Sequence, residues 1–182
     1  MGGPPVKPLQ PEGVSEVAYG NPKWQASSGS DRYRRSLYTY TKRTAPFAMF
    51  NAFDAPTGES CVAQRNRSNS PLQALTLLND VMMTDLSRHA GRRFATDNAD
   101  LPTQLSALFR SIVVRPPLPE ELSAIEAFYR EQHRYFSEDI PLAHRFLESK
   151  PAGTQDDNAA TLAAWTATAR ALFGLDETLS RE

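Results

Sequence analysis

The sequence predicts a mainly α-helical protein: a small helical bundle preceded by an irregular, proline-rich arm, with one short β-hairpin left open. Apolar residues recur at three- and four-residue steps through most of the second half, and turns containing proline separate these segments. Four of the first eleven residues are prolines. Because proline is excluded from helix interiors and central strands, we expect an extended arm over residues 1–30. Residues 31–182 are then expected to form a single, mainly helical domain.

The elements nearest the arm are the least regular. The arm contains the turn-forming strings "YGNP" and "SSGSD" and one large apolar anchor, Trp24. From Tyr33 to Tyr40 apolar and polar residues roughly alternate and β-forming residues are common, which predicts a short strand. The apolar run "PFAMFNAFDAP" is bounded by prolines and fits either a strand or one helical turn.

The clearest helix start in the chain lies in "SNSPLQALTLLND". Ser70 is a good N-cap, Pro71 suits the first helical position, and Gln73 completes a capping box with Ser70. We expect one helix from Pro71 to about Phe94. Its predicted inward stripe consists of Leu72, Leu75, Leu78, Met82 and Leu86.

Three further helices and a short segment are expected after this one. The first covers Leu101 to Val114, with Leu105, Leu108, Phe109 and Ile112 facing inward. The next opens at Pro119, where Leu118 is a poor N-cap, so its first turn is expected to fray. Its predicted apolar face consists of Leu122, Ile125, Phe128, Tyr129, Tyr135 and Phe136. A short segment covers Leu142 to Leu147, residues 149–157 form a surface loop, and Asn158 caps a last helix through Leu172.

Charge argues against a nucleic-acid partner. The chain has 20 basic and 21 acidic residues, a formal net charge of −1. The balance is uneven, since residues 1–98 carry 12 basic and 8 acidic side chains whereas residues 99–182 carry 8 and 13. The basic and aromatic strip "RRSLYTYTKRTAP" is therefore interpreted as a docking strip within the molecule or between domains, not as a phosphate-binding surface.

No recognisable catalytic or cofactor motif occurs in the sequence. His89, His133 and His144 do not form the paired spacing that places two metal ligands on one helical face, and Cys61 is the only cysteine. We therefore expect no metal and no cofactor in this chain, and enzymatic activity stays undecided. For Cys61, a buried inert thiol is favoured over a nucleophile, which would need a base and an orienting group.

One cluster predicts an anion site. Arg65, Arg67 and Asn69 lead directly into the helix that Ser70 caps. The free backbone amides of a helix N-terminus bind anions, and arginines at the entrance would reinforce such binding. The alternative, which we favour, is that these arginines pair with acidic residues of the second half.

Membrane spans and a signal peptide are not expected. Residues 1–13 lack the apolar core of a signal peptide, and no apolar run approaches the ~18 residues of a transmembrane helix. The location of this chain therefore stays open.

Three strings carry a resemblance to a known family. Arg34 to Thr44, Phe53 to Cys61 and Arg67 to Asp80 resemble RRSLYTYWKRT, FDAPxRExC and RTNTPLQALxLLND of the planctomycete-specific C-terminal domain of unknown function. The beginning and end of the chain are similar to the family as well. Thr41 stands where the family usually has tryptophan, which weakens any aromatic binding platform at this strip.

The resemblance implies a context more than a chemistry. Longer relatives typically carry upstream a signal sequence, often a cytochrome c-like segment with a haem-binding CxxCH, and sometimes a carbohydrate-binding-like module, and they are expected in the periplasm or otherwise outside the cytoplasm. This chain has none of those parts, so it is expected to be an N-terminally truncated member. Its expected partners are the upstream domains or a neighbouring subunit, which it would support structurally. The alternative is a domain that binds or processes glycans or sulfated glycans through the anion site at Arg65, Arg67, Asn69 and Ser70.

Overall fold

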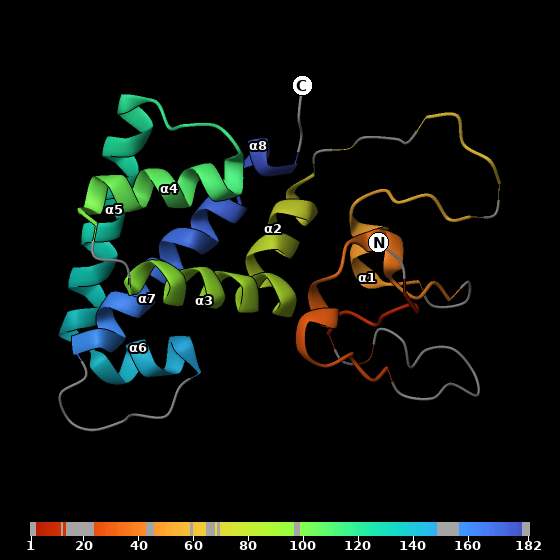
Figure 1. The fold of residues 1–182 in the computed structure, drawn as a ribbon, viewed down its shortest axis with the longest axis horizontal. Helices are drawn as coiled ribbons and strands as arrows, with labels where there is room; N and C mark the ends of the chain where they lie inside the picture. Colours follow the sequence, from red (N-terminus) through yellow and green to blue (C-terminus); the bar gives the residue numbers. More distant parts are fainter. Residues whose placement is uncertain are drawn as a thin grey trace. The chain divides into compact units, whose positions relative to one another are not determined.

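The computed structural model describes residues 3–11, 13, 24–42, 46–58, 60–64, 68, 70–96, 99–148 and 157–179. The chain forms two compact units, residues 1–82 and residues 83–182. Regular structure in the described ranges is helical, which confirms the mainly α fold (Figure 1). The predicted boundary between arm and domain at residue 30 stays a prediction.

The first unit holds short helices joined by irregular backbone. Its elements are the 3₁₀ helices η1 (Gly29–Tyr33) and η2 (Ser36–Tyr38) and the α-helices α1 (Ala48–Ala52) and α2 (Pro71–Asn79). The run between Pro46 and Pro56 was predicted to be either a strand or one helical turn, and it contains the short helix α1. The basic and aromatic strip contains η2.

The strand predicted from Tyr33 to Tyr40 is wrong, and the described residues contain no hairpin. A single parallel bridge joins Val6 to Thr39, in which Val6 N donates to the Tyr38 carbonyl and Tyr40 N donates to the Val6 carbonyl, both at 2.8 Å. Thr39 N instead returns to the carbonyl of Ser36 at 3.0 Å, which closes a 3₁₀ turn. The alternation of apolar and polar residues from Tyr33 to Tyr40 therefore corresponds to a single bridge with the arm, between Val6 and Thr39.

The arm contributes Val6 and Trp24 to the packing of the first unit. Val6 and Phe47 are buried. The Trp24 indole N–H donates to the Pro8 carbonyl at 2.8 Å, and its ring stacks on Phe47 with 6.2 Å between centroids. Phe50 meets Phe47 edge-on at 5.4 Å. The prolines thus keep the arm extended, and its few apolar side chains give it a place to pack.

The single helix predicted from Pro71 to Phe94 is wrong, because the chain breaks at Asp80. There α2 ends and α3 (Val81–Ala95) begins. The Asp80 backbone is extended, with φ −65° and ψ 138°, and its Oδ1 accepts a hydrogen bond from Met82 N at 2.8 Å. Aspartate competes well for such backbone donors, so it caps a new helix instead of continuing the old one.

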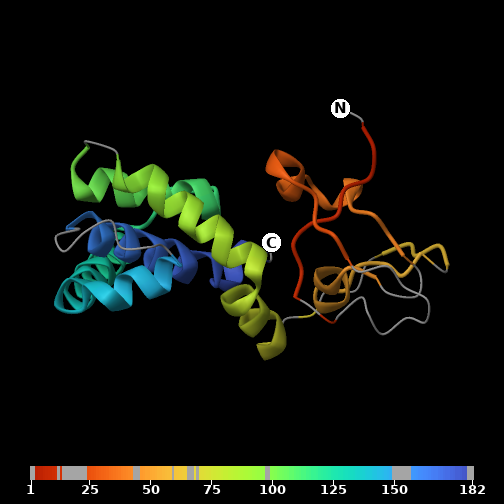
Figure 2. The ribbon, with the colours of Figure 1, turned by 90° about the horizontal axis from the view of Figure 1, so that it is seen from below.

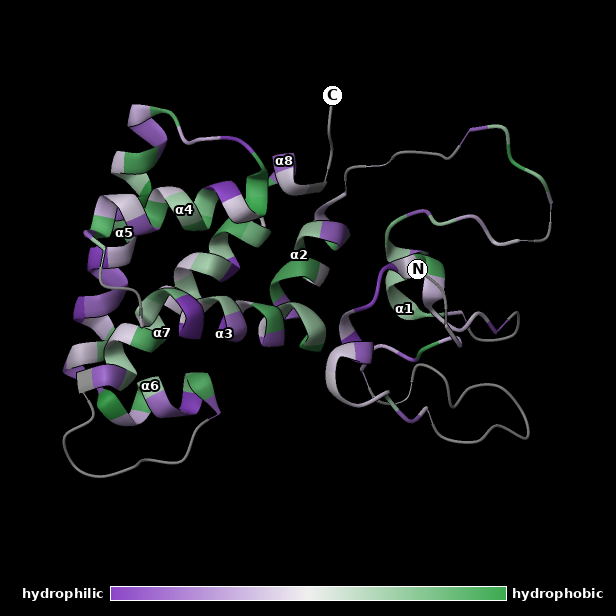
Figure 3. Ribbon diagram, in the orientation of Figure 1, coloured by the Kyte–Doolittle hydropathy of each residue, from purple (hydrophilic) through white to green (hydrophobic). Residues whose placement is uncertain are grey.

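The predicted leucine stripe is also wrong within α2. Leu72, Leu75 and Leu78 are 65%, 54% and 40% exposed, whereas Gln73 and Leu77 are buried. Positions 73 and 77 are one turn apart and share a face. The side chain of Gln73 is held inward by hydrogen bonds described below, which turns the three leucines outward. Figure 3 shows the apolar character of α2 in green.

The second unit is a helical bundle with one helix at its centre (Figure 2). Its elements are α3, α4 (Leu101–Val113), α5 (Pro119–Glu138), α6 (Ile140–Leu147), α7 (Asp157–Phe173) and α8 (Asp176–Leu179). The central helix α7 packs against α4, α5 and α6. It is rich in alanine and apolar around most of its circumference, which suits a helix covered on several sides. Its buried residues are Ala159, Ala160, Ala163, Ala164, Trp165, Thr166, Thr168, Ala169 and Leu172.

The helices of the second unit largely follow their predicted bounds. The inward positions of α4 are confirmed for Leu105, Leu108 and Phe109, which are fully buried. Helix α6 begins at Ile140, two residues before its predicted start, and Asp139 caps it by accepting from Leu142 N at 2.9 Å. Helix α7 begins at Asp157, so Asn158 lies in the first turn and is not the cap. The predicted loop at 149–157 falls outside the described residues, except for the backbone of position 157.

Helix α5 begins at Pro119 as predicted, and Leu118 is its N-cap. Leucine has no side-chain acceptor, but Glu121 reaches back and accepts from Leu118 N at 2.7 Å. This contact is one half of a capping box. It ties the first turn down, contrary to the expected fraying. Tyr135, assigned to the apolar face, is 55% exposed.

Two features fix how the central helix packs. Trp165 lies between Phe94 and Tyr129, with ring centroids 5.8 and 4.7 Å away. Gly91 of α3 lies directly against Thr166, where an added Cβ would be 3.0 Å from the Thr166 nitrogen and 3.2 Å from its Cα. Only glycine leaves room for this approach.

Arg115, just after α4, binds two carboxylates with one guanidinium. It donates to both oxygens of Glu121 at 2.8 and 2.6 Å and to both oxygens of Glu177 at 2.6 Å each. These bonds, together with the Leu118 N–H, lower the pKa of Glu121 from 4.5 to about 2. The pKa of Glu177 is lowered by the same guanidinium. The start of α5 and the short helix α8 are thereby joined.

The Arg115 contacts should stabilise the second unit only above acidic pH. A carboxylate whose pKa is depressed by folding contributes stability that is present above its ordinary pKa of 4.5 and is lost as pH falls toward about 2. We therefore expect Arg115→Gln to lower Tm at pH 7, and this difference from wild type to shrink between pH 4.5 and pH 2. Thermal denaturation followed by circular dichroism across this range measures it. Arg130→Gln, which removes the exposed pair with Glu126, is the matched control and should give a smaller difference. A difference for Arg115→Gln that is constant with pH would contradict the assignment.

Candidate functional site

A polar network lies at the start of α2. The Asp54 carboxylate oxygen Oδ2 accepts from the Ser68 hydroxyl, from Ser68 N at 3.0 Å, and from the Gln73 side-chain amide at 3.4 Å. The same amide also donates to the Ser68 hydroxyl at 2.9 Å. Asp54 occupies the left-handed region, with φ 53°, at the turn that follows α1. The turn thus aims its carboxylate at the segment that enters α2.

The predicted capping box is confirmed and forms the other half of this network. Gln73 N donates to the Ser70 hydroxyl at 3.3 Å, and Ser70 N donates to Gln73 Oε1 at 3.1 Å. Gln73 is only 3% exposed, so its amide is satisfied inside the protein at both ends. The strings Phe53 to Cys61 and Arg67 to Asp80 are therefore joined in space through three side chains.

The basic and aromatic strip is paired within its own unit. The Lys7 ammonium lies 5.8 Å from the Trp24 ring centroid and 5.5 Å from that of Tyr40. The Arg34 guanidinium lies 3.9 Å from the Tyr38 centroid, and its Nη1 donates to the carbonyl of Pro4 at 3.1 Å. These cation–π contacts use ring faces that a nucleic-acid or sugar platform would need open. The interpretation of the strip as a docking strip, within the molecule or between domains, stays a prediction.

The predicted anion site is described at only one of its four residues. The Ser70 hydroxyl is occupied in capping Gln73 N. Arg65, Arg67 and Asn69 lie outside the described residues. The site therefore stays a prediction.

The histidines and the cysteine are not gathered into a site. His133 Nε2 lies 3.2 Å from the Thr161 hydroxyl, and His144 is buried. Cys61 is exposed, which corrects the expectation of a buried thiol. Over the part of the chain that the structure describes, no three histidine, cysteine, aspartate or glutamate side chains are grouped to hold a metal ion. Among the helices described, none combines the length and the apolar character needed to cross a bilayer.

The outer side of α2 exposes three leucines. We call the side chains of Leu72, Leu75 and Leu78 the leucine face. Positions 72, 75 and 78 recur every three residues, and α2 contains no charged residue between Pro71 and Asn79. Val81, next after the break, is 48% exposed and extends the apolar surface. An uncharged apolar face of this kind is typical of a protein contact.

Comparison with known proteins places these features in a family. Residues 1–129 match a family model described as a protein of unknown function, DUF1553. The matched range contains all of the first unit and, in the second, the segment from α3 into α5. No curated protein and no solved structure matches the chain.

Proposed function

The chain belongs to the DUF1553 family of proteins of unknown function, and from this premise we propose that it is a structural module that docks onto another domain or subunit. The leucine face of α2 carries this proposal. Its side chains are 40–65% exposed, although leucine is usually buried. A partner surface that covers them would gain roughly 25 cal/mol per Å² of apolar area removed from water.

The polar network holds the leucine face in its outward position. Gln73 and Leu77 occupy the inner side of α2 because the Gln73 amide is bound by Asp54 and Ser68. Rotating the helix to bury the leucines would strip Gln73 of these partners, at a cost typical of unsatisfied buried polar groups. The local structure therefore supports an outward leucine face as a built feature of this helix.

The preferred partner is an apolar protein surface and not a glycan. A glycan site would need open aromatic faces or free cations, and Trp24, Tyr38 and Tyr40 each have a cation over the ring. The glycan alternative therefore rests on the predicted anion site at Arg65, Arg67, Asn69 and Ser70. A location outside the cytoplasm and an association with cytochrome c-like segments remain proposals that rest on the family resemblance.

The leucine face is tested by replacing all three leucines with glutamine. In the isolated chain, uncovered leucine faces should associate with one another, so wild type should sediment faster as concentration rises and should bind the dye ANS. Leu72→Gln/Leu75→Gln/Leu78→Gln should remain monomeric and bind less dye, with unchanged circular dichroism.

The matched control removes three exposed apolar residues that do not share a face. Leu37, Val62 and Leu118 are 83%, 57% and 61% exposed, and their glutamine variants remove a similar amount of apolar surface. The control should behave like wild type. Equal effects of the two triple variants, or a wild type that is monomeric at every concentration and binds no dye, would refute the proposal.

A further inference from the structure

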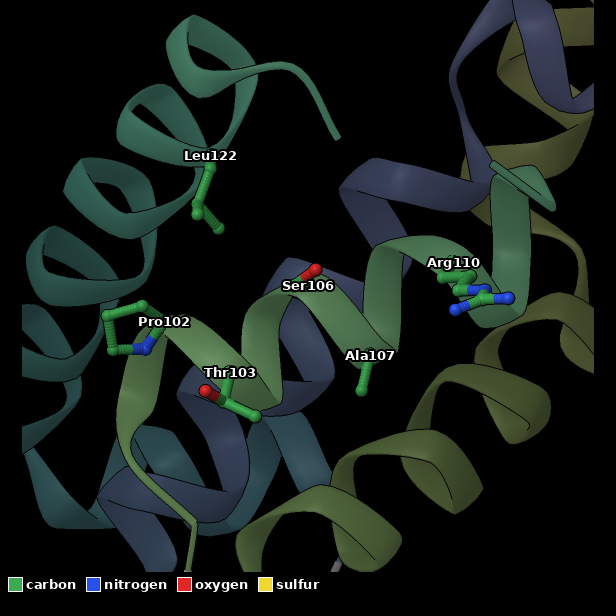
Figure 4. A pocket seen from close by; sticks show the side chains of 6 residues that line it. All are labelled: Pro102, Thr103, Ser106, Ala107, Arg110 and Leu122. Carbon is green, nitrogen blue, oxygen red and sulfur yellow. The ribbon is translucent and has the colours of Figure 1, made fainter. Parts of the chain in front are cut away.

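An open pocket of about 430 Å³ lies on α4 where that helix faces the start of α5. Figure 4 shows Leu122 projecting from α5 toward α4, with Pro102 and Arg110 at opposite ends of the α4 segment. The volume falls within the range of small-molecule sites, roughly 300–1,000 Å³. Its lining residues are Pro102, Thr103, Ser106, Ala107, Arg110 and Leu122.

The two ends of this pocket differ in chemistry. Pro102 and Leu122 give the N-terminal end of α4 an apolar wall. Ser106 and Arg110 are four residues apart, so they lie on the same side of the helix one turn from each other. Within the described part of the chain, neither the Ser106 hydroxyl nor the Arg110 guanidinium has a hydrogen-bond or ion-pair partner. No described residue therefore competes with a ligand for either group.

The remaining polar residue of the pocket is already occupied. Thr103 donates its backbone N–H to the Asp100 carboxylate at 3.2 Å, and its hydroxyl bonds to the same carboxylate, which lowers the pKa of Asp100. Asp100 thus stays ionised at the N-terminal end of α4. Its negative charge disfavours an anionic group at that end and leaves Arg110 as the cation that lines the pocket.

We propose that this pocket binds a small monocarboxylate with an aliphatic body. The carboxylate accepts hydrogen bonds from Arg110 and Ser106, and the aliphatic part lies along Ala107 toward Pro102 and Leu122. A guanidinium matches a carboxylate in both charge and donor geometry. A neutral ligand of the same length loses the charge-assisted bond, and acetate loses the apolar contact. The inference does not depend on the proposed docking function.

The probe is hexanoate, titrated into the ¹⁵N-labelled full chain and followed by amide chemical shifts. Saturable amide shifts are expected at residues 103–110 and at Leu122. Hexanol and acetate should each bind more weakly than hexanoate. Arg110→Gln should weaken hexanoate binding roughly tenfold or more, as expected for loss of a charge-assisted hydrogen bond.

Two variants keep the test decisive. Arg92→Gln removes another exposed arginine, on α3, and should leave the titration unchanged. Ala107→Phe places a ring in the pocket from an exposed position and should abolish binding while the other amide shifts stay in place. Absence of saturable shifts, equal binding of hexanol and hexanoate, or undiminished binding to Arg110→Gln would each overturn the proposal.

Discussion

Replacing Trp165 with alanine should lower the free energy of unfolding of the second unit by about 3–5 kcal/mol. The side chain is 2% exposed and stands between the rings of Phe94 and Tyr129. Its removal leaves a cavity that the neighbouring helices can refill only in part, because α3 already touches α7 through Gly91. Urea unfolding followed by far-UV circular dichroism measures the change.

Two further variants test whether the loss in free energy of unfolding comes from core packing at Trp165 and not from the loss of any aromatic side chain. Trp165→Phe keeps a ring between Phe94 and Tyr129 and should cost less than the alanine change. Tyr135→Ala removes an aromatic side chain that is 55% exposed on α5, and should stay within about 0.5 kcal/mol of wild type. A Trp165→Ala chain less than about 1 kcal/mol below wild type would show that α7 is not the centre of this core.

Replacing Gln73 with leucine should loosen α2 by about 2 kcal/mol. Leucine has a similar volume, so the effect comes from lost hydrogen bonds and not from a cavity. Ser70 N would lose its side-chain acceptor, and Asp54 and Ser68 would each lose the amide donor of Gln73. Native-state hydrogen exchange should show amides of α2 exchanging roughly 30-fold faster.

Thr76→Ala provides the control within the same helix. The Thr76 hydroxyl donates only to the carbonyl of Leu72 in its own helix, at 2.8 Å, so its loss should leave exchange close to wild type. If Gln73→Leu exchanged no faster than Thr76→Ala, the network would not be what holds α2. The outward leucine face would then need another cause.

The starts of α2 and α5 were predictable from the sequence because their causes are local. Ser70 and Gln73 lie three residues apart, and the box they form needs no distant partner. Pro119 fixes the beginning of α5 in the same way. Periodicity also predicted the buried residues Leu105, Leu108 and Phe109 of α4, since this face packs against apolar residues of α5 and α7.

The errors occurred where hydrophobic periodicity is overruled by other contacts. At Asp80 the apolar periodicity continues, but the Asp80 side chain accepts a hydrogen bond from Met82 N and ends the helix. Periodicity alone cannot predict that the capping bond prevails. The inner side of α2 was predicted to be leucine, yet it carries Gln73. That choice depends on Asp54, nineteen residues away. The strand predicted at Tyr33 to Tyr40 had no partner beyond Val6 in the described residues.

The candidate sites were predictable only in outline. The strip beginning at Arg34 was interpreted as a docking strip. Within it the Arg34 guanidinium lies over the Tyr38 ring, and the Lys7 ammonium of the arm lies over the Tyr40 ring. Asp54 was missed as the centre of a network, although an aspartate in a turn between two prolines was a signal for backbone capping. The α4 pocket could not be predicted from the sequence, because its lining residues form no motif and are of types common on protein surfaces.

The positions of the two tryptophans have a spectroscopic consequence. The chain has two, Trp24 in the first unit and Trp165 in the second, and each stacks on a phenylalanine of its own unit. Each unit therefore carries one tryptophan. When tryptophan is excited selectively over tyrosine, chains with Trp24→Phe or Trp165→Phe would emit from one unit alone, so their fluorescence can resolve whether the two units melt together or one after the other.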